Sequence, residues 1–177
     1  MNCIHFIWLG GQLPQKALEN LARWLDAINP KQWKVVLWTN RACLELARAR
    51  QESRLWRHSS FHGPEKDNAL VLSAAFGATP LVYFIHDGPG SESCHIVCFE
   101  DVFRQKEDEK LVEACLYEID YGLKPVASDI LRIMILCRFG GWYVDIGDAG
   151  LSEKPFPDHA MVDQALAPKG FLCHVVD

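Results

Sequence analysis

The sequence predicts an α/β fold with a mostly parallel sheet flanked by helices, and three consecutive segments carry that prediction. Residues 4–9 (IHFIWL) form an apolar, β-rich run closed by a glycine pair, which indicates a buried strand followed by a turn. Pro14 then opens a segment whose apolar residues recur at helical spacing until the Asn-Pro pair at residues 29–30. Residues 34–38 (KVVLW) form a second apolar strand. The order strand, helix, strand is typical of parallel sheets that carry helices on their faces.

Shorter segments continue this alternation through the middle of the chain. In order, we expect a charged helix at 41–56, a polar break at 58–66, a short helix at 69–76, strands at 81–85 and 95–99 separated by a turn at 87–90, and an acidic helix at 106–121. Whether the two strands form a hairpin stays open, because their connection is longer than those that hairpins favour.

The length and composition are those of an ordinary globular protein. The 177 residues suffice for one packed domain, so we expect a single domain over residues 1–177. Hydrophobic residues make up 49% of the chain and charged residues 23%, which excludes a disordered or collagen-like protein. A formal net charge of −5 and a pI near 5.8 argue against nucleic acid as a partner, because that binding rests on neutralising phosphates.

No segment has the features of a targeting signal or a membrane span. The N-terminus shows neither a basic stretch nor a small-residue cleavage site. The longest apolar-rich stretch, residues 70–85, is short for a spanning helix and is interrupted by Gly77 and Pro80. We therefore expect no membrane span, and either a cytoplasmic location or secretion by a route that needs no signal peptide.

The seven cysteines are an odd number without the spacing of a disulfide framework, so we expect free thiols. Cys115 and Cys137 lie in apolar helical patterns, where a thiol behaves as a small hydrophobic group. Cys94, His95 and Cys98 suggest a zinc site, but their spacing matches none of the usual paired-ligand patterns, and we interpret them as strand residues.

Residues 126–150 (VASDILRIMILCRFGGWYVDIGDAG) are the most informative segment. Ser128 is the expected N-cap of a helix, with Asp129 in the first turn at the positive end of the helix dipole. The following residues are apolar nearly all round, which predicts a buried helix. The glycine pair at residues 140–141 ends it, with one glycine in a left-handed conformation, and residues 142–146 continue as a strand.

This arrangement gathers polar and aromatic residues at one edge of the expected sheet. Trp8 and Asp145 each lie near the C-terminal end of an apolar strand, and ligands of open α/β sheets bind beyond those ends. Asp129 and Arg132 are three residues apart on a helix and therefore share a face. A carboxylate and a guanidinium on a buried helix must pair with each other or hold a ligand.

The motifs IHFIWLGG at residues 4–11, SDILR at 128–132 and GGWYVDIGD at 140–148 together resemble the DXD-motif sugar transferases. These are GT-A glycosyltransferases that include the large glucosylating toxins of bacteria and the mannosyltransferases related to them. The similarity is closest to the catalytic domain of the toxins, and it covers roughly the first 40 residues and residues 126–150.

The resemblance implies a GT-A fold, a nucleotide-sugar donor that is usually a UDP-sugar, a protein or glycan acceptor, and Mn²⁺ or Mg²⁺. The resemblance implies that Trp8 stacks on uracil and that the backbones of Ile7 and Leu9 contact the base edge. It implies that Asp129 and Arg132 hold hydroxyls of the donor sugar, and that Tyr143 and Asp145 lie near the ribose and sugar. Asp145 and Asp148 are the candidate metal ligands. These residue types suit the chemistry, because sugar hydroxyls need carboxylate acceptors and guanidinium donors, and a departing diphosphate needs cationic neutralisation.

The strand departs from the family motif at its second aspartate. It reads Asp145-Ile146-Gly147-Asp148, so Gly147 occupies the position of the metal-binding aspartate and Asp148 comes one residue late. A shift of one residue turns a side chain to the opposite face, unless a bulge restores it. A non-catalytic binding or interaction module that has lost its metal is therefore the alternative hypothesis. A third is a chain truncated at its C-terminus that needs a partner chain to complete the site.

Each of these residues also has a purely structural interpretation. Trp8 can be a core residue, Asp129 with Arg132 a cap and a salt bridge, and Asp145 a strand-end carboxylate that accompanies a turn. His5 lies within the first expected strand, and we interpret it as a core histidine whose nitrogens are hydrogen-bonded.

Overall fold

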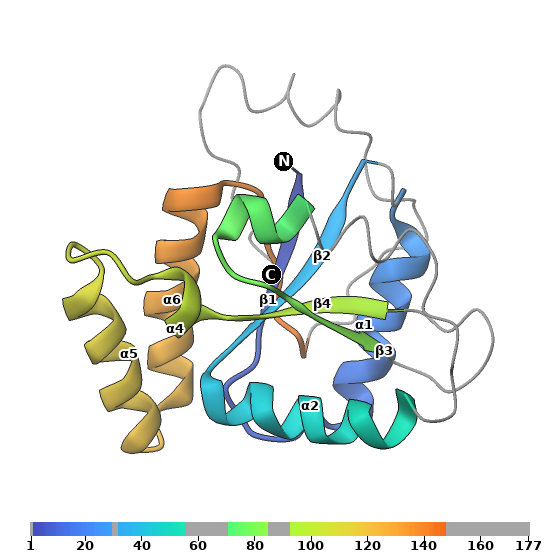
Figure 1. The fold of residues 1–177 in the computed structure, drawn as a ribbon, viewed down its shortest axis with the longest axis horizontal. Helices are drawn as coiled ribbons and strands as arrows, with labels where there is room; N and C mark the ends of the chain where they lie inside the picture. The colour runs from blue at the N-terminus through green and yellow to red at the C-terminus, as the bar shows by residue number, and fades with distance from the viewer. Residues whose placement is uncertain (1, 30–31, 56–70, 85–92, 148–177) are drawn as a thin grey trace, which may run out of the picture.

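The computed structural model describes residues 2–29, 32–55, 71–84 and 93–147. Within these ranges, one sheet runs in the order β3-β4-β2-β1-β5 (Figure 1). Its strands are β1 (Cys3–Ile7), β2 (Lys34–Thr39), β3 (Leu81–Phe84), β4 (Ser93–Cys98) and β5 (Trp142–Tyr143). β1 is parallel to both of its neighbours, β2 and β5, and β2 is parallel to β4. Only β3 is antiparallel, against β4, so the mostly parallel α/β prediction is confirmed for the described residues.

The helices alternate with the strands largely as predicted. They are α1 (Gln15–Ala27), α2 (Arg41–Leu55), α4 (Phe99–Val102), α5 (Glu109–Asp120) and α6 (Lys124–Phe139), and residues 71–76 are also helical. The expected β1-α1-β2 unit and the helix after it are confirmed with shifts of one or two residues at their ends. Phe99, expected in a strand, begins α4 instead. β3 and β4, consecutive strands for which a hairpin was left open, pair antiparallel as the strands of a hairpin do.

The two faces of the sheet carry different helices, because alternate residues of each strand point to opposite sides. Phe6 of β1 packs on one face with Leu18 and Leu21 of α1. Ile7 of β1 packs on the other face with Leu131 of α6, in a cluster that also includes Phe76, Phe103 and Cys115. Figure 1 shows α1 on one side of the molecule and α5 beside α6 on the other.

The helix α6 begins earlier than the sequence motif suggested. It starts at Lys124, with Pro125 in its first turn and Leu123 as N-cap, so the prediction of Ser128 as N-cap is wrong. A proline in the first turn costs nothing there, because its missing N–H would have no partner inside the helix. Asp129 is consequently in the second turn and not at the positive end of the helix dipole.

The prediction that α6 is buried nearly all round is also wrong. Its buried residues Ala127, Leu131, Met134 and Ile135 lie at helical spacing on one face, whereas Ile133 is 61% exposed. Cys137, expected in an apolar environment, is exposed too. The sheet and α5 cover only part of the circumference of the helix, so apolar side chains on its outer face remain in contact with solvent.

The last strand is shorter than predicted. β5 comprises only Trp142–Tyr143, although the Val144 N–H still donates to the His5 carbonyl oxygen at 2.9 Å. The Ile146 carbonyl oxygen accepts a hydrogen bond from Asn20 of α1 at 3.0 Å. The chain therefore leaves the sheet after Val144, because the Ile146 carbonyl oxygen is bonded to a side chain of α1 and not to the backbone of β1.

The remaining cysteine, metal and membrane predictions concern local environments. Cys94, His95 and Cys98 are buried residues of β4, as predicted, and burial raises the pKa of the Cys94 thiol to about 12. In the part of the chain that the structure describes, no three His, Cys, Asp or Glu residues are grouped to hold a metal ion. The same part contains no helix both long and apolar enough to cross a membrane.

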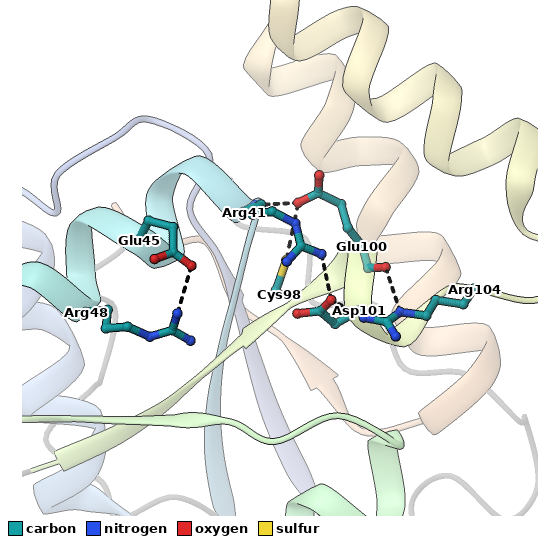
Figure 2. A network of polar contacts seen from close by, with 7 residues as sticks. All are labelled: Arg41, Glu45, Arg48, Cys98, Glu100, Asp101 and Arg104. Atoms are coloured by element: carbon teal, nitrogen blue, oxygen red, sulfur yellow. Dashed lines mark hydrogen bonds and ion pairs between the residues drawn. The ribbon is translucent and has the colours of Figure 1, made fainter.

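A charged network fixes the start of α2 at the carboxyl end of β2 (Figure 2). The Arg41 backbone N–H donates to the Glu100 carboxylate of α4, and the Arg41 guanidinium donates to Asp101 at 2.6 Å. Arg104 donates to the same Asp101 carboxylate. Burial by itself would raise the pKa of Asp101, but the hydrogen bonds from the two arginines outweigh it and lower that pKa. The network holds α2 and α4 together beside the edge where the parallel strands end.

Candidate functional site

The candidate site lies at the edge where the parallel strands end. Because β1, β2 and β5 run in the same direction, their carboxyl ends meet at that edge. Trp8 directly follows β1, and Asp145 comes two residues after β5. The chain passes from β1 to β2 on one side and reaches β5 on the other, so the strand order reverses at β1. Such a reversal is where open α/β sheets usually bind their ligands.

Four of the predicted site residues, together with Ser128, form one continuous set of contacts. We call this set the α6–β5 cluster: Ser128, Asp129, Arg132, Tyr143 and Asp145. The Arg132 guanidinium donates to Asp129 at 3.0 Å, and its central carbon lies 5.6 Å from the centroid of the Tyr143 ring. The Tyr143 hydroxyl donates to Asp145 Oδ1 at 2.6 Å. The Tyr143 hydroxyl has a single proton, which it donates to Asp145. In its contact of 3.5 Å with the Ser128 hydroxyl, Tyr143 is therefore the acceptor and Ser128 the donor. Ser128, expected as a cap, is thus a member of the cluster.

The cluster is accessible to a ligand. The side chains of Asp129 and Arg132 are 61% and 41% exposed, so the expectation of a buried ion pair is wrong. An exposed pair of this kind contributes about 1 kcal/mol or less to stability, so the cost of redirecting it toward a ligand is small. Burial, reinforced by Asp145, raises the pKa of Tyr143 to about 12, which keeps its hydroxyl protonated and directed at the Asp145 carboxylate.

Trp8 lies on the opposite face of the sheet from this cluster. Its indole packs against the core layer of α1, its Nε1–H donates to the Gly11 carbonyl oxygen at 2.9 Å, and the Thr39 hydroxyl donates to the Trp8 carbonyl oxygen at 2.7 Å. A Cβ atom on Gly10 would lie 2.6 Å from the indole, so only glycine at that position allows this placement. Trp8 is half-buried, which is compatible with a structural role and with the predicted contact to a ligand.

A small cavity, open to solvent, lies beside the indole. It is lined by Trp8, Gly11, Thr39 of β2, and Cys43 and Arg50 of α2, among others. The side chains of Ile7 and Leu9, whose backbones were predicted to contact the base, are buried on the α6 face of the sheet.

The acidic end of the site is described only as far as Gly147. Asp148, the second candidate metal ligand, lies outside the described residues. Asp145 is therefore the one predicted metal ligand whose position is known. A divalent cation held by one carboxylate and by substrate phosphates is common for Mg²⁺, so Asp145 fits that mode of binding, whereas an all-protein site is not formed by the described residues.

Two buried polar residues, Asn20 and His5, lie near the site, and no functional role was predicted for either. Asn20 is 2% exposed on the face of α1 that packs against the sheet. The sequence could have indicated this role, because Asn20 is a polar residue between Leu18 and Leu21 in an otherwise apolar helical stripe. His5 is fully buried and hydrogen-bonded through both nitrogens, so its prediction as a satisfied core histidine is confirmed.

The partners of His5 determine its protonation state. Trp38 Nε1–H can only donate, and it lies 3.0 Å from His5 Nδ1, which must therefore carry a lone pair. The proton is then on Nε2, which donates to the Gly140 carbonyl oxygen at 3.0 Å. Burial lowers the pKa of His5 to about 4, although the bond to Gly140 opposes part of that shift.

This environment makes stability depend on pH. The unfolded chain takes up a proton on His5 near pH 6.5, whereas the folded protein takes it up only near pH 4. The free energy of unfolding should therefore fall as the pH falls from 6.5 to 4, by about 3 kcal/mol from this residue. Urea denaturation at pH 7 and pH 4.5 measures the loss. His5→Gln should show a smaller loss, since an amide can satisfy both partners without titrating; equal losses in the two proteins would contradict this.

Comparisons with known proteins show a distant similarity to a bacterial protein. No protein-family model matches the chain. The chain is 26% identical over 169 residues to "Subversion of eukaryotic traffic protein A" of Legionella pneumophila subsp. pneumophila (strain Philadelphia 1). The aligned region covers 96% of this chain but only 19% of the Legionella protein, so the chain spans about a fifth of that relative's length.

Proposed function

We propose that the chain is a GT-A glycosyltransferase domain that transfers a sugar from a UDP-sugar to a protein or glycan acceptor. The observation that carries the proposal is the α6–β5 cluster, in which Asp129, Arg132, Tyr143 and Asp145 contact one another in sequence at the carboxyl edge of the sheet. Trp8 follows the neighbouring strand at the same edge. The resemblance to the DXD-motif sugar transferases rests on these same residues.

The proposed ligand spans the edge of the sheet from one face to the other. Uracil stacks on the Trp8 indole beside the cavity that Thr39 and Cys43 line, since a flat indole suits a flat base. The diphosphate crosses the ends of β1 and β5. The donor sugar then reaches Asp129 and Arg132, whose exposed side chains offer acceptors and donors to its hydroxyls.

The chain's own residues position the donor at the acidic end. Tyr143 holds Asp145 through a hydrogen bond of 2.6 Å and thereby fixes the direction of its carboxylate. Asp145 would hold Mn²⁺ or Mg²⁺, which when bound supplies positive charge to the departing diphosphate. Fixing the donor in this way accelerates transfer by orientation, because the reacting atoms no longer have to find one another in solution.

Calorimetric titration with UDP in the presence of Mn²⁺ tests donor binding. We expect heat of binding for the parent protein and an affinity about fivefold or more weaker for Trp8→Ala, because stacking on an aromatic ring contributes about 1–3 kcal/mol per base. Tyr121→Ala, which removes an exposed aromatic ring of the α5–α6 connection, is the matched control and should bind normally. Absence of heat at millimolar UDP would refute the proposal.

Gly147 favours a second candidate function, a binding module without catalytic activity. Glycine at the second position of the acidic motif cannot ligate a metal, and a Cβ atom at Gly147 would meet no heavy atom within 4 Å. Gly147→Asp is thus sterically permitted. UDP-sugar hydrolysis in excess Mn²⁺ separates the candidates: activity in the parent protein excludes the non-catalytic module, whereas activity gained only by Gly147→Asp supports it.

The Legionella relative suggests where to look for an acceptor. Its name describes subversion of eukaryotic traffic, and we propose by that likeness that eukaryotic trafficking proteins are the first acceptors to test. Incubation of the protein with radiolabelled UDP-glucose and a eukaryotic membrane-traffic fraction would reveal a labelled product. Asp145→Asn serves as the inactive control.

A further inference from the structure

The segment that carries Asp145 is held from both faces of the sheet by buried polar side chains. We call residues 140–147 the acidic segment. His5 on the α6 face donates from Nε2 to the Gly140 carbonyl oxygen, where the segment begins. Asn20 on the α1 face donates from Nδ2 to the Ile146 carbonyl oxygen, where it turns away from the sheet. Both donor–acceptor distances are 3.0 Å.

The bond from Asn20 fixes the residue immediately after Asp145. Asn20 is 2% exposed and comes from a helix whose other inward residues are apolar. Removing the amide would leave a backbone carbonyl oxygen without this donor in a buried environment, which is unfavourable. The Ile146 carbonyl is therefore constrained, and with it the directions of the flanking positions 145 and 147.

His5 fixes the other end and the middle of the segment. Its backbone carbonyl oxygen accepts from the Val144 N–H at 2.9 Å, in addition to the side-chain bond to Gly140. Trp38 of β2 holds the imidazole in place by donating to Nδ1 and also stacks on Phe139, the last residue of α6. His5 thus connects the C-terminal end of α6 to β5. The helix α6 carries Asp129 and Arg132, and β5 carries Tyr143.

We propose that Asn20 and His5 are positioning residues for the candidate donor site, holding the acidic segment so that Asp145 stays against Tyr143 on the α6 face. Neither residue belongs to the α6–β5 cluster, and both act through backbone groups of the acidic segment. The effect on donor binding rests on the function proposed above, whereas the effect on the segment itself does not.

Amide hydrogen exchange of the ligand-free protein tests the positioning directly. In Asn20→Leu, which keeps a side chain of similar size without the donor, we expect the Val144 amide to exchange at least tenfold faster, while amides between β1 and β2 keep their protection. Leu18→Ala, a core substitution on the same helix, is the control and should affect both groups of amides alike. Equal protection of Val144 in Asn20→Leu and the parent protein would overturn the proposal.

Two substitutions of His5 test whether its side-chain hydrogen bonds hold the segment. His5→Gln can accept from Trp38 and donate to Gly140, so its Val144 amide should stay protected, whereas His5→Leu should lose that protection. Loss of protection in both variants alike would show that side-chain hydrogen bonding to Gly140 is not what holds the segment.

Calorimetric titration with UDP and Mn²⁺ measures whether the positioning of the segment affects donor binding. We expect at least fivefold weaker binding in Asn20→Leu than in Leu18→Ala, with normal binding in His5→Gln. Unchanged affinity in Asn20→Leu would overturn the link between positioning and the donor site. Absence of UDP binding by the parent protein, combined with selective exchange at Val144, would refute the proposed function and leave the positioning of the segment supported.

Discussion

Replacing Gly141 by alanine should destabilise the protein by about 4 kcal/mol, the sum of backbone strain and overpacking of about 2 kcal/mol each. Gly141 has a φ of +89°, a backbone conformation that L-residues with a side chain rarely adopt. Its added Cβ atom would also lie 2.5 Å from the Cys3 carbonyl oxygen and 2.9 Å from His5 Nε2. The first contact is with strand backbone, which cannot move without disturbing the sheet.

Thermal unfolding measures this effect, and Gly122→Ala is its matched control. Gly122, in the turn between α5 and α6, has a similar φ of +81°, but a Cβ atom there would meet nothing within 4 Å. Gly122→Ala should therefore show only the strain component, and its melting temperature should fall by clearly less than that of Gly141→Ala, for which we expect roughly 12 °C. Equal shifts would show that the close approach to β1 has no energetic consequence.

Replacing Asp145 by asparagine should reduce sugar transfer or UDP-sugar hydrolysis by about a hundredfold or more, as expected for loss of an electrostatic group at the reacting end of a site. Asparagine has the same shape and still accepts from the Tyr143 hydroxyl, so the fold should be retained. What is lost is the negative charge that would hold a divalent cation beside the diphosphate.

The control for this substitution is Asp26→Asn, an exposed residue near the end of α1 on the opposite face of the sheet, which should leave the rate unchanged. Melting temperatures of both variants establish that they fold. A parent-like rate in Asp145→Asn would remove Asp145 from the chemistry, and the acidic segment would then have only a structural role.

The β1-α1-β2 unit was predictable because its signals are local and agree with one another. An apolar run, a helical stripe bounded by Pro14 and an Asn-Pro pair, and a second apolar run permit few arrangements. The start of α6 was not predicted, because Ser128 followed by Asp129 matched a cap while Pro125 upstream was the better signal. The exposure of Ile133 was also missed, since an apolar residue on an apolar helix suggests burial regardless of what covers it.

The candidate site was predictable in composition but not in arrangement. Helical spacing placed Asp129 and Arg132 on one face, and the resemblance implied that Tyr143 and Asp145 lie near the same ligand. The contacts of Tyr143 with Arg132 and Asp145 were not predicted, because they depend on how α6 packs beside β5. Trp8 packs on the opposite face of the sheet because of the register of β1 with β5, in which His5 pairs with Tyr143. This register could not be predicted from the sequence. The role of Asn20 depends on a partner 126 residues away, so only the folded chain reveals it.

The proposed function requires that one UDP-sugar spans the edge of the sheet from Trp8 to Asp145. Nuclear magnetic resonance titration of the ¹⁵N-labelled protein with UDP-glucose and Mg²⁺ can follow both ends of the site: the Trp8 indole N–H, which donates to Gly11, and the Asp145 amide. We predict that both resonances shift along one saturation curve, with the same midpoint. No shift of either resonance at millimolar UDP-glucose, or a shift at Trp8 alone, would contradict the proposed function.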